Sequence, residues 1–372
     1  MNRFRLEKST GPLWVRPLLP VLAFIITFFL TATLLIWADA NPFEGYYYFL
    51  IAPLSNRVSA IEVLVKSTPL LLTGASVAIA FAAGYWNIGA EGQLYAGAIA
   101  ATWIGISVEG ISPFIGVPLM ILGGFAAGML WALPPALLKV KLHIDEIVTT
   151  LLLNTVIVLF VSFLLNGPWR DPVSGWPQSP EIDPGTVFFK LMPRSRLHFG
   201  FIVALIVIAI LWYVLSRTSL GLRMRAAGLG KEAARFAGVK VNRTIMTAAL
   251  SSGGIAGLAG VGEVAGIHFH LIEAISPGYG YTGIVVATLG ALNPIGVLIA
   301  GTFMGLIDTG SQTVSRALGV PAYLGDVVMA TLLLVTLGAM VLQNFRFRRS
   351  PEADHEPDSS GPDVALDTGE AS

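Results

Sequence analysis

The chain has 372 residues, of which 54% are apolar and only 12% are charged, about half the charged share of an average soluble domain. A soluble protein of this length needs a far more polar surface, so the composition excludes a soluble globular domain and favours a chain surrounded by lipid. Cysteine is absent, which excludes disulfides, thiolate metal sites and cysteine nucleophiles. The formal net charge is zero, but residues 351–372 hold seven acids and no Lys or Arg, which leaves 23 basic against 16 acidic residues in the rest.

The N-terminal part combines a basic segment, residues 1–16, with an apolar run at 18–37. A bilayer core needs roughly 20 consecutive apolar residues per helix. The run is followed by Ala38, Asp39 and Ala40, which resembles a signal-peptide cleavage site, but signal sequences have apolar runs of about 7–15 residues. We therefore expect a retained first transmembrane helix with residues 1–16 in the cytoplasm.

Long apolar runs continue through most of the chain. Residues 61–106 are too many for one span and are interrupted near Gly84, so they are expected to form two helices. Further runs lie at 113–140, 147–165, 199–215, 244–264, 281–306 and 323–342, with breaks at 266–280 and at Asn293-Pro294. The sequence predicts an all-α, polytopic transmembrane helical bundle over residues 17–345, with broken or re-entrant helices.

The distribution of charge predicts the orientation of this bundle. Residues 217–243 carry seven Lys or Arg and one acid, and the positive-inside rule places them in the cytoplasm. Residues 167–197 contain six prolines and two tryptophans and are expected to form an ordered external loop. Both termini in the cytoplasm require an even number of crossings, which leaves eight or ten spans of the inner (plasma) membrane.

Residues 346–372 are predicted to be a disordered, acidic cytoplasmic tail, because they are rich in Pro, Ser and acids and poor in aromatic residues. Such a tail is either solvated without a specific role or a binding segment for a partner.

Glycine pairs with G-x-x-x-G spacing predict close helix packing in lipid. They are Gly124/Gly128, Gly253/Gly257, Gly262/Gly266 and Gly301/Gly305.

A polar cluster interrupts two apolar runs at Trp86, Asn87, Glu91 and Gln93. Their polar groups would be costly in contact with lipid, and such groups are tolerated where they line a cavity or pair inside the protein. Two interpretations stay open: a structural break that satisfies neighbouring backbone, or a broken helix at a translocation path. Asn154, in the middle of a later span, belongs to the same candidate set.

The basic segment 217–243 holds a second candidate site. Residues 231–237 are good helix formers, Glu232 and Arg235 can pair at i,i+3, and Gly238 can end the helix in a left-handed cap. This short helix offers a soluble partner a docking point, or it is a charged turn anchored at the headgroups. The candidate residues are Arg223, Arg225, Lys231, Glu232, Ala233, Ala234, Arg235 and Gly238.

No catalytic or metal motif is found. The i,i+2 spacing of His268 and His270 diverges on a helix, and no third ligand lies at a suitable offset. Asp145 and Glu146 are expected to pair with Lys139 or Lys141 at a span end. The P-loop pattern is missing, because Arg225 occupies the place of its leading glycine and Glu232 follows Lys231, so any ATP is hydrolysed by another protein. The chain is therefore expected to be no enzyme and to bind no cofactor and no nucleic acid.

The run of residues 87–93, Asn-Ile-Gly-Ala-Glu-Gly-Gln, resembles the permease subunits of bacterial ABC importers for branched-chain amino acids, simple sugars and nucleosides. The stretches around Asn154 and residues 166–172, 221–238 and 280–287 are also similar, and the closest similarity is to nucleoside permeases. The resemblance covers roughly residues 60–345.

This resemblance implies that residues 217–243 contain a coupling helix seated on a separate ATP-hydrolysing subunit. It also implies an extracytoplasmic solute-binding lipoprotein and a second permease subunit, a paralogue or a second copy, with the path at their interface. Trp86, Asn87, Glu91, Gln93 and Asn154 are the candidate lining residues for a small polar solute. Part of the family's coupling signature is missing, since Ala248 stands where an isoleucine is expected.

The alternatives are a simple-sugar or branched-chain amino acid permease and, in a different class, an ion-coupled secondary transporter. The latter needs carboxylates on broken helices, for which Glu91 and Asp308 are available. It would leave the basic segment 217–243 unexplained. An intramembrane lipid-modifying enzyme lacks a catalytic cluster.

Overall fold

The computed structural model describes residues 4–8, 18–321, 323–328 and 345–349 and a few positions between 330 and 338. The elements are β1 (Phe4–Lys8), α1 (Leu18–Trp37), α2 (Pro42–Tyr46), η2 (Tyr47–Ile51), α3 (Ala52–Ser55), α4 (Arg57–Ala82), α5 (Ala90–Ser107), α6 (Pro113–Leu142), α7 (Glu146–Asn166), η3 (Pro184–Thr186), α8 (Gly200–Arg217), α9 (Ser219–Leu229), α10 (Lys231–Phe236), α11 (Val241–Glu263), η4 (Val264–His268), α12 (Tyr279–Leu289), α13 (Pro294–Leu318) and β2 (Phe345–Arg349). The described residues between 324 and 338 are helical. The predicted all-α fold is confirmed.

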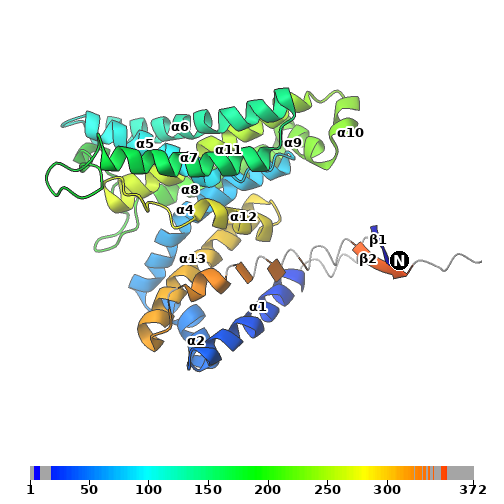
Figure 1. The fold of residues 1–372 in the computed structure, drawn as a ribbon, viewed down its shortest axis with the longest axis horizontal. Helices are drawn as coiled ribbons and strands as arrows, with labels where there is room; N and C mark the ends of the chain where they lie inside the picture. Colours follow the sequence, from blue (N-terminus) through cyan, green and yellow to red (C-terminus); the bar gives the residue numbers. More distant parts are fainter. Residues whose placement is uncertain are drawn as a thin grey trace, which may run out of the picture.

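Helix α4 is the centre of the bundle (Figure 1). It packs against α8, α11, α12 and α13. In its most apolar stretch of 18 residues 89% are buried, compared with 28% in the corresponding stretches of α6 and α7. The helices α5, α6, α7 and α11 form one group, whereas α1, α2 and α13 lie on the other side of α4 (Figure 1). An apolar helix that is buried all round belongs in the core, and helices with a large exposed apolar surface face lipid.

Six described helices are long and apolar enough to cross a membrane, namely α4, α6, α7, α8, α11 with η4, and α13. Helices α1 and α5 have 20 and 18 residues. The chain is a multi-pass membrane protein, and eight or ten crossings stays a prediction. The expected interruptions are confirmed, because α4 ends at Ala82, α5 begins at Ala90, and α12 and α13 are separated before Pro294.

Glycines bring α5, α6 and α11 into backbone contact. A Cβ at Gly128 would overlap the carbonyl of Gly253, and one at Gly97 would overlap the carbonyl of Gly257. Close approach of backbones is what small residues allow when lipid removes the hydrophobic drive for helix association. The predicted packing role is therefore confirmed for Gly124/Gly128 and Gly253/Gly257, and also for Gly301/Gly305, which contact α4 at Leu71 and Ser67. The Gly262/Gly266 pair instead lies against the imidazole of His198, which precedes α8.

Residues 167–199 form an ordered loop over one end of the bundle. Its backbone bonds to the segment after η4, with Ser179 N donating to Leu271 O at 3.0 Å and Ile182 N donating to Phe269 O at 2.9 Å. His198 is buried against Gly266, and burial lowers the pKa of its imidazole to about 4, so the ring is neutral at physiological pH. The loop is thus ordered, as predicted, and its external location stays a prediction.

The two described ends pair with each other: β1 and β2 form an antiparallel ribbon in the register Phe4 to Arg349. Residues 346–349, with which the predicted tail begins, lie in β2, where Arg346 is opposite Glu7 and Phe347 is opposite Leu6. The predicted acidic tail at 351–372 lies outside the described residues.

Candidate functional site

The first interruption lies between α4 and α5. Gly84 has φ 73°, and a Cβ there would lie 3.1 Å from the Cα of Gly228 in α9. A residue with a side chain is disfavoured at this φ, so glycine permits both the turn and the close approach of two backbones. Residues 83–89 thereby link the bundle to the segment that follows α8.

The interruption is closed by an amide network. Asn87 Nδ2 donates to Gln93 Oε1 at 2.8 Å and to Ser252 Oγ at 2.8 Å, and Asn87 Oδ1 accepts from the N–H of Gly89 at 2.9 Å. Ser252 Oγ donates to the carbonyl of Ser76 at 2.7 Å. Ser76 lies six residues before the end of α4, about 9 Å along the axis at 1.5 Å per residue. The chain therefore turns back into the bundle before α5 begins.

The second interruption lies between η4 and α12. Phe269 has φ 63° and Gly278 has φ 97°, and the residues between them are extended or turned. Tyr95 Oη donates to the carbonyl of Glu273 at 3.1 Å. Helix α12 has 11 residues, about 16 Å, too short to span a hydrocarbon core of about 30 Å.

The N-termini of α5 and of the short helix α12 meet. A Cβ at Gly280 would overlap the backbone of Glu91, and the Gly280 N–H donates to Glu91 Oε2 at 2.7 Å. Glu91 is only 5% exposed. A carboxylate at a helix N-terminus accepts a free N–H and is stabilised by the helix dipole. Glu91 therefore joins α5 to α12.

Asn154 binds the same region from α7. Its Oδ1 accepts from the Gly92 N–H at 2.9 Å, and its Nδ2 donates to the Ile88 carbonyl at 3.0 Å and to Tyr281 Oη at 3.2 Å. One amide thus contacts the α4–α5 interruption, α5 and the first turn of α12. We call residues 83–93, 279–281 and their partners Ser76, Ser252 and Asn154 the junction.

All five predicted path residues lie in the junction, and four of them are buried there. Asn87, Glu91, Gln93 and Asn154 are buried and bonded to protein groups, whereas Trp86 is 52% exposed. Their contact with solute stays a prediction, and the structure shows what they do locally, which is to satisfy the polar groups of two broken helices. Sequence analysis missed Ser76, Ser252 and Tyr281, whose roles depend on which helices pack together.

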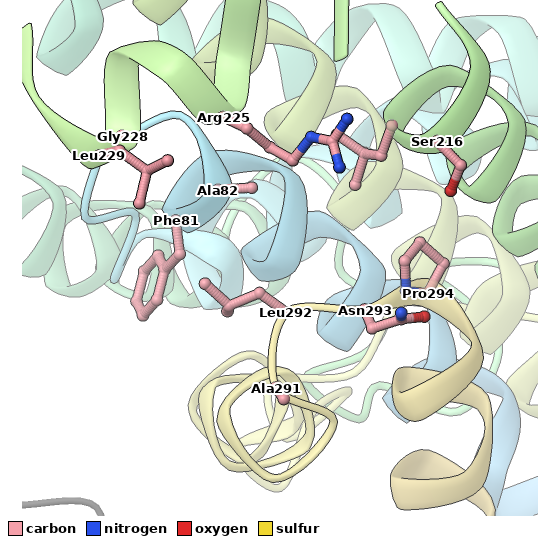
Figure 2. A pocket seen from close by; sticks show the side chains of 11 residues that line it. Phe81, Ala82, Ser216, Arg225, Gly228, Leu229, Ala291, Leu292, Asn293 and Pro294 are labelled. Atoms are coloured by element: carbon pink, nitrogen blue, oxygen red, sulfur yellow. The ribbon is translucent and has the colours of Figure 1, made fainter. Parts of the chain in front are cut away.

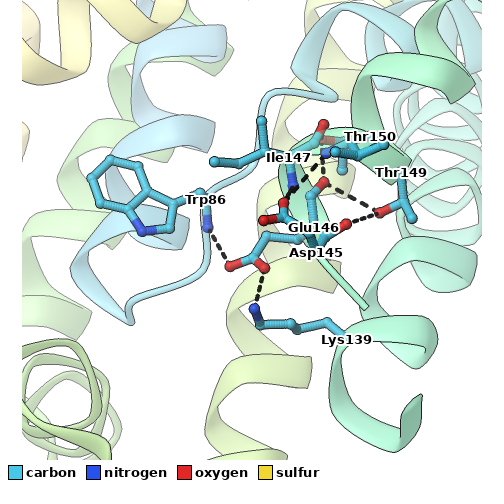
Figure 3. A network of polar contacts seen from close by, with 8 residues as sticks. Trp86, Lys139, Asp145, Glu146, Ile147, Thr149 and Thr150 are labelled. Carbon is cyan, nitrogen blue, oxygen red and sulfur yellow. Dashed lines mark hydrogen bonds and ion pairs between the residues drawn. The ribbon is translucent and has the colours of Figure 1, made fainter. Parts of the chain in front are cut away.

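The α6–α7 turn holds Trp86 in place (Figure 3). Glu146 Oε1 accepts from the main-chain N–H of Trp86 at 3.4 Å. Glu146 also forms an ion pair with Lys139, as the sequence predicted for this end of the span. Asp145 instead caps α7, accepting from the Ile147 N–H at 2.7 Å. The indole packs on Phe81 with ring centroids 4.5 Å apart.

Helices α9 and α10 form a hairpin that projects from the bundle (Figure 1). The last residue of each helix is a large apolar residue with an exposed side chain: Leu229 of α9 is 92% exposed and Phe236 of α10 is 98% exposed. We call these two residues the tips of the hairpin. Ala234 is 3% exposed and fixes α10 to its base, and Gly238 ends the hairpin with φ 82°, as predicted. The predicted Glu232–Arg235 ion pair is present at 2.8 Å. The remaining predicted residues Arg223, Arg225, Lys231 and Ala233 all lie on this hairpin.

A cavity of about 390 Å³ lies beneath the hairpin (Figure 2). The end of α4, the α8–α9 segment and the α12–α13 turn line it, and Arg225 extends toward its middle. Ala291 and Leu292 in that turn have φ 52° and 57°, a conformation that costs energy for residues with a Cβ. The hairpin therefore contacts residues 83–89 through Gly228 and faces the α12–α13 turn across the cavity.

Ion pairs cluster near the other end of α4. Lys66 pairs with Asp308 of α13 at 3.3 Å, Glu62 pairs with Arg196 of the 167–199 loop, and Glu263 lies 3.7 Å from His268. His268 and Asp308 were noted from the sequence, but not their pairing with Glu263 and Lys66. Over the described residues no group of three or more His, Asp or Glu side chains could hold a metal ion.

Comparisons with known proteins agree with this architecture. Residues 59–337 match the family model described as "Branched-chain amino acid transport system / permease component". The glucose ABC transporter permease protein TsgB13 of Haloferax volcanii is 33% identical over 91% of this chain and 92% of its own length. The guanosine ABC transporter permease protein NupP of Bacillus subtilis is 30% identical over 88% and 94%, and the nucleoside ABC transporter permease protein NupB of Lactococcus lactis is 30% identical over 85% and 89%.

Proposed function

Because the chain belongs to the branched-chain amino acid transport system permease family, whose members are ABC transporter subunits and not enzymes, we propose that it conducts nucleosides into the cell. Separate ATPase subunits supply the energy, and the path runs along the junction.

The α9–α10 hairpin supports the docking of an ATPase. Two large apolar side chains, Leu229 and Phe236, stand almost fully exposed at its tips, among Arg and Lys side chains. Exposed apolar groups on a basic, projecting segment are typical of a surface that a partner covers. The base of the hairpin contacts residues 83–89 through Gly228 and Gly84, so a displacement of the hairpin reaches the junction directly.

The meeting of two broken helices is the single observation that carries the path. Irregular backbone inside a membrane protein occurs where it is buried in protein or lines a cavity, and half-helix N-termini recur at transport sites. The exposed, uncharged ring of Trp86 suits a neutral polar solute. Contact is expected to be weak, because a tightly bound solute would not be released.

Two relatives that transport guanosine or nucleosides by their names support nucleosides as the solute. The 33% identity to a glucose permease supports a simple sugar as the second candidate. An ion-coupled transporter has less support, since both of its candidate carboxylates have partners within the protein, Gly280 for Glu91 and Lys66 for Asp308.

The transporter we propose contains a second, paralogous permease and a solute-binding lipoprotein. Lactococcus lactis also contains the nucleoside permease NupC, which is only 27% identical over 68% of this chain, so this chain is more similar to one of two permeases from that organism. Pairing of β1 with β2 supports termini on the same side of the membrane. The basic residues of both strands favour the cytoplasmic side of a bacterial inner membrane.

This function is tested by measuring the uptake of labelled solutes in a strain from which the gene for this chain has been deleted. We expect accumulation of labelled nucleosides to fall in the deletion strain and to return with the intact gene, while uptake of leucine and ribose is unchanged. A deletion strain that loses glucose uptake and keeps nucleoside uptake would favour the sugar permease instead.

A further inference from the structure

Residues 83–89 and helix α12 bury or half-bury nearly all of their side chains, whereas Glu273, Ala274 and Pro277 of the second interruption are exposed. In residues 83–89 the one exposed side chain is Trp86, at 52%, and in the described residues of α12 it is Tyr281, at 43%. Residues 83–89 and α12 therefore each present one aromatic ring at the surface of the bundle.

Helix α12 is not a lipid-facing helix. The lipid-facing surface of α7 carries many exposed apolar side chains at helical spacing, among them Leu152, Val156, Leu159 and Phe163. In α12 the residues after Tyr281 are buried or half-buried, so its single exposed ring stands alone at the N-terminus. That N-terminus is where α12 meets α5, as Glu91 and Gly280 show.

The ring of Tyr281 has a fixed polar end and an open apolar part. Its hydroxyl accepts a hydrogen bond from Asn154 Nδ2 at 3.2 Å, and Asn154 is itself fixed by the Gly92 N–H and the Ile88 carbonyl. The amide is 2% exposed, so solvent does not compete for these bonds. Asn154 is thus a positioning residue that sets the place of the Tyr281 ring.

We propose that the ring of Tyr281, positioned by Asn154, is the solute-facing surface that favours solutes carrying a flat unsaturated ring over plain sugars. The inference rests on the proposed path at the junction. An aromatic face stacks on any nucleobase, since every base has a π-face, and such stacking is tolerant of the base's identity. A single exposed ring gives a contact that selects the solute without holding it tightly.

Uptake of labelled guanosine, uridine and glucose by cells expressing the complete transporter tests this role. We expect Y281L to lower nucleoside uptake at low concentration by about tenfold, within the range that loss of one stacked base contact gives, and to leave any glucose uptake unchanged. Y281F keeps the ring but loses the hydrogen bond from Asn154, so its nucleoside uptake should fall between that of the unmodified protein and that of Y281L. Y213L is the matched control, because Tyr213 is a 59% exposed tyrosine that belongs to α8 and to neither interruption.

The variants also separate this inference from the proposed function. Y281L with normal nucleoside uptake, an equal loss in Y281F, or an equal loss for glucose overturns the role of the ring. If the Y281L protein is absent from the membrane, Y281W takes its place as the test variant. Its larger ring should lower the KM for nucleosides, and an unchanged or higher KM overturns the proposal. Failure of the proposed function shows in the unmodified protein, as absence of nucleoside uptake.

Discussion

The junction and the α9–α10 hairpin are the two polar regions that sequence analysis singled out, and they differ in what completes them. In the junction, Asn87, Gln93 and Asn154 are at most 2% exposed and bond to groups of the same chain. In the hairpin, Leu229 and Phe236 are more than nine-tenths exposed. The chain itself satisfies the first region, whereas the second leaves apolar surface for another protein to cover.

This difference indicates that the junction contributes mainly to the stability of the fold, whereas the hairpin contributes to transport through the partner that docks on it. Substituting a junction residue leaves buried groups without partners and lowers the stability of the fold. Substituting a hairpin tip changes no internal contact, so it affects only what docks there. The following predictions test that division.

The largest effect is expected from Phe236→Asp. A charge on the most exposed apolar tip disrupts an apolar contact with the ATPase, so we expect uptake to be lost and the ATPase no longer to copurify. The thermal midpoint in detergent should change little, because surface substitutions shift the free energy of unfolding by within about 0.5 kcal/mol.

Val173→Asp is the matched control, since Val173 is 93% exposed in the loop 167–199. It should retain both uptake and the ATPase. Equal losses in the two variants would show that any exposed charge is harmful and would remove the distinction between the regions.

Asn87→Leu is expected to destabilise the junction. It removes the oxygen that accepts from the Gly89 N–H and from Gln93 Nε2, and the nitrogen that donates to Gln93 Oε1. Each buried polar group left unpaired costs about 1–3 kcal/mol. We expect a loss of about 3 kcal/mol and a lower thermal midpoint. Asn166→Leu is the control, because that exposed amide bonds only within its own helix. A stable Asn87→Leu protein would contradict a self-satisfied junction.

Gly84→Ala tests the contact between the two regions. The substitution places a Cβ 3.1 Å from the Gly228 Cα and also strains a positive φ, which costs roughly 1–2 kcal/mol. Gly110→Ala has a similar φ of 64° but no atom within 4 Å, so it measures the backbone strain alone. We expect Gly84→Ala to lower both stability and uptake further than Gly110→Ala, and equal effects would remove the mechanical link.

The smallest effect on stability is expected from Glu232→Gln. It breaks an exposed ion pair with Arg235, and such pairs contribute only about 0.3–0.5 kcal/mol. We expect an unchanged thermal midpoint and a severalfold fall in uptake. A drop in stability with normal uptake would place Glu232 with the junction residues instead.

Sequence analysis succeeded where structure is local. The Glu232–Arg235 pair spans three residues and the left-handed Gly238 ends the helix that holds them, so helical spacing and cap chemistry were enough to predict both. The polar break around Asn87 was also recognised, because Gly89 and Gly92 weaken the helix and unpaired amides are costly in lipid.

The partners of that break could not be predicted. Ser252 reaches Asn87 only because α11 packs beside α4, and Gly280 reaches Glu91 only because α12 begins halfway along the bundle. Lys66 and Asp308 meet for the same reason, since their helices are neighbours in space and far apart in sequence. Side chains that match chemically are too common in this sequence to indicate which pairs form.

Reconstitution tests the central claim, that a separate ATPase drives transport through the α9–α10 hairpin. Liposomes holding this chain and its second permease are assayed for accumulation of a labelled nucleoside, with and without the ATPase subunits and ATP. The account predicts accumulation only when ATPase and ATP are both present, and none for Phe236→Asp under any condition. Accumulation against a gradient without any nucleotide-hydrolysing subunit would contradict it.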